Sequence, residues 1–217
     1  MADKDAVPVR KLILIPAVIT LAVTLLRLLG ERQGWSPFLF NRAAGGGGAL
    51  VGIAWLVIFF GAWFAWKLLA EGQAPAGPWR PLGHALVGLA IVLGLSFGAQ
   101  ALKLPNFGQF GVFVVASIVA LFVAMRGWPA LGRTLVAYGL AARIPVAIVM
   151  LFAIFGSWGT HYDVAPPDFP AMGPAQKWFW IGLLPQLTIW MGFTVVVGMF
   201  FGGLVAAARR PRPAVAA

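Results

Sequence analysis

Long runs of apolar residues, separated by short polar segments, dominate this sequence. A membrane hydrocarbon layer about 30 Å thick is crossed by an α-helix of about 20 residues. Six runs meet that length, near residues 11–29, 47–70, 83–102, 109–125, 133–156 and 177–206. The pattern predicts an all-α polytopic bundle of about six transmembrane spans, with residues 1–217 forming a single membrane domain.

Composition supports the same interpretation. The 217 residues are 61% hydrophobic and only 10% charged, whereas water-soluble domains carry roughly a quarter charged residues. Cysteine is absent, which excludes disulfides, thiolate metal sites and cysteine nucleophiles. We therefore expect neither a metal nor a cofactor. We interpret the net charge of +10 as contact with anionic lipid headgroups, not with nucleic acid.

The basic residues predict the orientation. More of them flank the side that would hold both termini, so the positive-inside rule places both termini in the cytoplasm. That side carries Lys4, Arg10, Lys11, Lys67, Arg80, Arg126, Arg133, Arg209, Arg210 and Arg212, and the other carries Arg27, Arg32, Arg42, Lys103 and Lys177. Trp79 and Trp128 would mark the cytoplasmic interface. A bias toward Ala, Gly and Pro, and toward Arg over Lys, is compatible with a bacterial inner membrane.

Small residues and prolines predict details of the helices. Three glycine pairs at a spacing of four, which lets helix backbones approach closely, are expected to pack within the bundle: Gly48/Gly52, Gly94/Gly98 and Gly198/Gly202. Proline inside a span removes an amide and is expected to kink the helix. The prolines concerned are Pro16, Pro145 and Pro185.

Arg143 is the residue most suggestive of function. It follows Arg133 by ten residues, about 15 Å along a helix, and so lies near the middle of the fifth span. A guanidinium there costs several kcal/mol unless it faces the protein interior. Two interpretations stay open. Arg143 binds an anion or a headgroup, or it is structural and bonds polar groups such as the Ala141 carbonyl, which Pro145 leaves without its amide donor.

The first span carries a polar stripe. Thr20, Thr24, Arg27 and Glu31 follow one another at spacings of four, three and four, which places them on one helix face toward the bundle. Arg27 and Glu31 are spaced for a local ion pair. The stripe could also line a solvated vestibule at the outer surface.

The segment after the fifth span brings together a histidine and two carboxylates, His161, Asp163 and Asp168. Such groups can perform acid–base chemistry or bind metal. No spacing fixes a metal geometry, however, and the surrounding prolines are equally typical of a rigid, solvated loop.

Three functions fit these features. No aspartate or glutamate lies deep in a predicted span, which disfavours proton- or sodium-driven carriers. The favoured hypothesis is a small-solute permease or channel-like protein, with Arg143 and the polar stripe along the path. The first alternative is a non-catalytic subunit or assembly factor, partnered by other membrane subunits or a second copy of the chain. The second is a membrane enzyme whose outer-face site uses His161, Asp163, Asp168 and Glu31.

Overall fold

The computed structural model describes residues 9–167 and 169–209, and these are helical or irregular, with no strand. The all-α prediction is confirmed. Five helical stretches within the described part are long and apolar enough to cross a membrane: Val9–Arg32, Arg80–Ala101, Asn106–Met125, Pro129–Gly156 and Pro174–Ala208. A sixth apolar helix, Leu56–Ala70, is shorter than these five, so the structure is roughly consistent with the prediction of about six spans. Multiple apolar helices of this length make the chain a multi-pass membrane protein.

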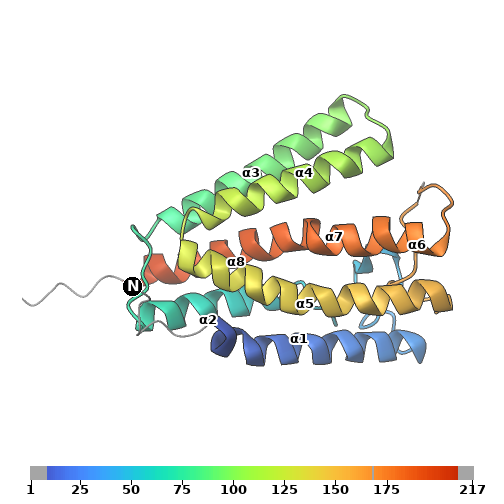
Figure 1. Ribbon diagram of the computed structural model, residues 1–217, viewed down its shortest axis with the longest axis horizontal. Helices are drawn as coiled ribbons and strands as arrows, with labels where there is room; N and C mark the ends of the chain where they lie inside the picture. Colours follow the sequence, from blue (N-terminus) through green and yellow to red (C-terminus); the bar gives the residue numbers. More distant parts are fainter. Residues whose placement is uncertain (1–8, 168, 210–217) are drawn as a thin grey trace, which may run out of the picture.

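The helices run alternately up and down (Figure 1). They are α1 (Val9–Arg32), α2 (Leu56–Ala70), α3 (Arg80–Ala101), α4 (Asn106–Met125), α5 (Pro129–Gly156) and α8 (Ile189–Ala208), with the short α6 (Pro174–Lys177), a π-helix (Trp178–Leu183) and α7 (Leu184–Leu187) before α8. The start of α1 and the end of α8 therefore lie at one end of the bundle, called here the terminal end. The opposite end is called the loop end.

The second helix is shorter than the sequence predicts. It begins at Leu56, not near 47, because the preceding glycines adopt positive φ angles, +72° at Gly45, +71° at Gly46 and +76° at Gly48. Left-handed backbone of this kind interrupts a right-handed helix. Gly48 and Gly52 are consequently not on a helix, and interpreting them as a helix-packing pair was wrong. Residues 47–55 cross the loop end as irregular backbone.

The terminal half of the bundle is closely packed. Gly61 of α2 faces α8 so closely that a Cβ on it would lie 2.6 Å from the Gly198 Cα. A Cβ on Gly202 would lie 3.1 Å from that of Ala65, so the Gly198/Gly202 prediction is confirmed. Around this contact lie fully buried side chains from α2, α5 and α8, namely Phe64, Leu131, Leu135, Val195 and Met199.

The α3–α4 pair diverges from the other helices toward the loop end (Figure 1). Gly94 and Gly98 lie on α3, and a Cβ on either would meet nothing within 4 Å. The prediction that this pair packs within the bundle was therefore wrong. Both glycines occupy a position where a side chain would be accommodated without movement.

The last span is interrupted. The π-helical turn immediately precedes Pro185, whose missing amide deprives the Ile181 carbonyl of its usual donor. The backbone leaves helical geometry at Thr188, with φ −124° and ψ −72°, and α8 starts afresh at Ile189. The helices α1 and α5, by contrast, continue as single helices through Pro16 and Pro145.

Tryptophans divide into two kinds. Trp79 is 65% exposed at the start of α3, as expected of an interfacial residue. Trp128 is 1% exposed, and its indole N–H donates to the Gln73 carbonyl at 2.9 Å. Trp128 lies at the α4–α5 turn, at the terminal end as predicted, but its ring is packed inside the core and is not exposed to lipid.

Candidate functional site

A cavity of about 550 Å³ lies in the loop half of the bundle. It is lined by Thr24 and Arg27 of α1, residues 45–49 and 52–55, Phe110 and Phe113 of α4, Arg143, Val146 and Met150 of α5, His161, Tyr162, Val164, Pro166 and Phe169, and Trp180, Ile181, Pro185, Gln186, Ile189 and Trp190 of the broken last span. The irregular backbone of 47–55 thus lies where non-helical structure is tolerated in membranes, against a cavity.

Arg143 reaches this cavity from the middle of α5. The side chain is 4% exposed, and its Nε has no hydrogen-bond partner among the described residues. Its guanidinium lies 4.7 Å above the ring of Trp190, a cation–π contact. The Ala141 carbonyl is not among its partners, so that example of a structural bond was wrong, whereas the choice between a structural and a binding role stays a prediction. Trp190 stabilises the charge only in part, and the N–H groups of the Arg143 guanidinium remain free to donate hydrogen bonds to a ligand.

Gln186 is a second polar group with unused bonding capacity in the wall. It is 6% exposed, its Nε2 approaches the Met150 sulfur at 3.7 Å, and its Oε1 has no partner among the described residues. Neither Gln186 nor Trp190 was singled out from the sequence. The sequence could have indicated Gln186, because an amide side chain follows Pro185 within an apolar run. It does not show that the helix breaks at Thr188, between Gln186 and Trp190.

Arg27 and Glu31 form the expected ion pair, with Arg27 Nε donating to Glu31 Oε1 at 2.8 Å. The pair is buried, with Arg27 7% and Glu31 0% exposed. The other end of Arg27 donates to the carbonyls of Asn41 and Gly46 at 3.1 and 2.9 Å. A Cβ on Gly52 would lie 3.1 Å from the guanidinium, so glycine there leaves room for it. Arg27 therefore ties the irregular segment to α1.

The two threonines of the stripe face the bundle as predicted. Thr20 is 1% exposed, donates to the Pro16 carbonyl at 2.8 Å and lies 2.8 Å from the Tyr138 hydroxyl of α5. Thr24 is 2% exposed and lines the cavity, while Thr20 lies outside its wall. The stripe is thus partly a helix contact with α5 and partly cavity wall.

His161 bonds Glu31, which lies 130 residues earlier in the chain. Its Nδ1 lies 2.5 Å from Glu31 Oε1, and its backbone N–H donates to Oε2 at 2.8 Å. Since a carboxylate can only accept, Nδ1 carries the proton and the Nε2 edge faces Gly46 and the cavity. Burial lowers the pKa of His161, and the nearby Arg27 lowers it further, whereas Glu31 and Asp163 oppose the shift.

The carboxylate of Asp163 bonds its own turn and not the His161 ring. Asp163 accepts from the backbone amides of Gly159 and Thr160, at 2.9 and 2.7 Å, and from the Thr160 hydroxyl at 2.8 Å. It therefore shapes the turn before His161, and grouping it with His161 as an acid–base pair was wrong. Asp168 lies outside the described residues. Tyr162, whose pKa is raised by burial, donates to the Thr24 carbonyl at 3.2 Å.

The described residues of the cavity wall carry positive charge. Those that are charged are Arg27 and Arg143, and no carboxylate is among them. Glu31, behind the wall, balances Arg27, while none of the ion pairs found in residues 9–167 and 169–209 involves Arg143. In the same part of the chain, His, Asp and Glu side chains form no group of three that could hold a metal. The arrangement can bind an anionic group at Arg143.

Comparison with protein-family models, with curated proteins and with solved structures found no match to this chain.

Proposed function

We propose that this protein is a permease for a small organic anion, which binds in the loop-half cavity with its anionic group against Arg143. The observation that carries the proposal is a buried guanidinium that lines a cavity of about 550 Å³ and makes no hydrogen bond to the described protein. A charge in that position is costly until an opposite charge arrives. An anion in the cavity supplies it.

The rest of the wall favours an organic solute over a simple ion. Gln186 offers an amide that can bond a second polar group, and Trp190 and Phe113 offer aromatic surface. Pockets for organic ligands characteristically combine mostly apolar walls with a few placed polar groups. A fully hydrated inorganic ion would gain little from the apolar part of this wall.

The closed terminal half supports transport by alternating access. Phe64, Leu131, Leu135 and Met199 fill the bundle between the cavity and the terminal end, each 0% exposed. The structure would thus be open toward one side only, and transport requires a second state in which these side chains separate. By the distribution of basic residues, the terminal end faces the cytoplasm of a bacterial cell and the cavity faces the outside.

The bond between Glu31 and His161 gives the enzyme alternative less support. Glu31 also accepts the Arg27 Nε and the His161 amide, so its oxygens are engaged in holding the 157–173 segment against α1. No serine, cysteine or carboxylate lies among the described residues of the cavity lining. We therefore assign the Glu31–His161 pair to holding the outer wall in place.

The absence of cysteine provides a direct test. Ile189→Cys places one thiol in the cavity wall beside Trp190, and Gly94→Cys places one on α3 away from it. The probes are the methanethiosulfonate reagents carrying ethylsulfonate and ethyltrimethylammonium, which are similar in size and opposite in charge. We expect the sulfonate to react faster with Ile189→Cys, and Arg143→Gln to remove that preference.

Permease and binding protein are separated by the side of labelling. The cavity thiol of a permease reacts with the sulfonate reagent in right-side-out and in inside-out vesicles, because the cavity opens to each side in turn. Reaction in right-side-out vesicles alone would contradict transport and indicate a protein that only binds the anion. A cationic preference, or none, at Ile189→Cys would contradict the anion site.

A further inference from the structure

A second hollow lies at the terminal end, on the surface between α3 and α4. It has a volume of about 600 Å³ and is lined by residues that include Trp79, Arg80, His84, Val87, Val123 and Arg126. Two arginines of the lining thus lie near an exposed tryptophan and the apolar side chains of two valines. No carboxylate is among the described residues that line the hollow.

Close backbone packing fixes the two arginines relative to each other. Gly127 follows Arg126 at the end of α4, and a Cβ on it would lie 2.9 Å from the Pro81 Cα and 3.0 Å from the Arg80 carbonyl oxygen. The turn between α4 and α5 is therefore pressed against the first turn of α3. His84 Nδ1 donates to the same Arg80 carbonyl at 2.9 Å, which turns the imidazole along the wall of the hollow.

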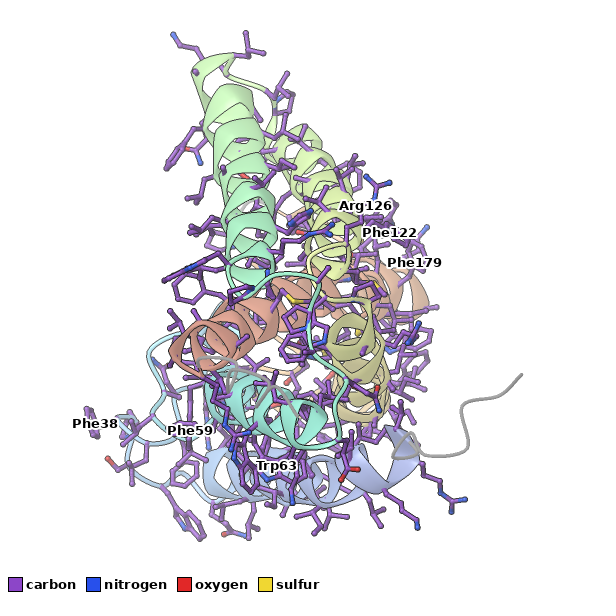
Figure 2. All side chains as sticks on the ribbon, turned by 90° about the vertical axis from the view of Figure 1, so that its left-hand side faces the viewer. Phe38, Phe59, Trp63, Phe122, Arg126 and Phe179 are labelled. Atoms are coloured by element: carbon purple, nitrogen blue, oxygen red, sulfur yellow. The ribbon has the colours of Figure 1, made fainter. Side chains whose placement is uncertain are left out.

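The composition of the hollow changes along the membrane normal. Trp79 precedes α3 as its N-cap and Arg80 is its first residue, so both lie at the terminal end, where headgroups and interfacial tryptophans lie. Val87 and Val123 lie further along the two helices, toward the hydrocarbon. Phe122, 60% exposed, extends this apolar surface and lies next to Arg126 at the side of the α3–α4 pair (Figure 2).

We propose that this hollow binds one anionic phospholipid from the leaflet at the terminal end. Its phosphate is held between Arg80 and Arg126, and an acyl chain lies over Val87 and Val123. Guanidinium groups pair with phosphate through parallel hydrogen bonds, which favours arginine over lysine in such sites. The site is separate from the anion cavity, and the two proposals stand independently.

The test uses the full chain in mild detergent and native mass spectrometry with added phosphatidylglycerol or phosphatidylcholine. The double variant Arg80→Gln/Arg126→Gln is expected to bind phosphatidylglycerol about 25-fold more weakly, because each basic residue contributes about fivefold. The single variant Arg126→Gln should lose about fivefold. The control Lys67→Gln/Arg133→Gln removes two charges from the same end outside the hollow and should retain wild-type binding.

Three outcomes would overturn the proposal. An equal loss in the control would mean that the overall charge of the terminal end attracts the lipid, with no site. Unchanged binding in the double variant, with the chain still folded, would exclude these arginines. Displacement of the lipid by inorganic phosphate at millimolar concentration, with no requirement for the acyl chains, would indicate a site for free phosphate.

Discussion

Replacing Arg143 by methionine separates a binding role from a structural one, because the two roles predict opposite changes in stability. Methionine keeps much of the length and apolar stem of arginine but removes the charge. On insertion scales, an arginine at the centre of a membrane helix costs about 2.5–3.5 kcal/mol. The substitution removes that cost.

The contact that Arg143 would lose is the one with Trp190, at 4.7 Å. A cation–π pair contributes about 0.5–2 kcal/mol, depending on its burial. Arg143 makes no hydrogen bond to the described protein that would be lost as well. The balance gives a variant about 0.5–3 kcal/mol more stable than the wild type, with the anion preference of the cavity abolished.

The free energy of unfolding is measured by reversible denaturation in detergent, beside the Ile189→Cys labelling ratio. Arg133→Met, at an exposed basic residue of the same helix, controls for the loss of one charge and should leave the labelling ratio unchanged. A structural Arg143 with satisfied partners would instead cost about 3–5 kcal/mol on removal. A destabilised variant that keeps its preference for the sulfonate would refute the reasoning.

Three further results are expected. Gly61→Ala should destabilise the bundle by about 1–3 kcal/mol, because the new Cβ would lie 2.6 Å from the backbone of α8. Gly94→Ala should be neutral or stabilising by up to about 1 kcal/mol, because its Cβ meets nothing. Equal free energies of unfolding for the two variants would contradict the close contact between α2 and α8. Since burial lowers the pKa of His161, its neutral form stabilises the fold above the ordinary histidine pKa, and this contribution is lost as the pH falls through the lower, folded value. Acidification over that range should therefore lower the melting temperature while raising the ratio of sulfonate to ammonium labelling, and His161→Asn should flatten both pH profiles. Glu31→Gln should cost about 3–5 kcal/mol by leaving Arg27 buried and unpaired, and proteolysis of the 157–173 segment in folded protein would report its release.

Part of the site followed from local sequence. The spacing of Arg27 and Glu31 on one helix turn predicted their ion pair, and a cation ten residues into an apolar helix predicted the depth of Arg143, because helical geometry fixes both. The partner of His161 could not be found in this way. Glu31 precedes it by 130 residues, and no local rule brings the end of α1 to the segment after α5.

The sequence by itself determined the medium and the all-helical, multi-pass architecture, since the length of the apolar runs and the scarcity of charge allow no other way of satisfying the backbone. It also determined which end of the bundle collects the basic residues. Only the tertiary structure decided what faces what: that Gly61 meets Gly198 while Gly94 meets nothing, that Trp128 is buried, and that Arg143, Gln186 and Trp190 line one cavity. The reason is that apolar residues are equally suited to lipid and to a protein interior, so hydrophobicity sets membrane depth, while the rotation of each helix depends on the shape of its neighbours.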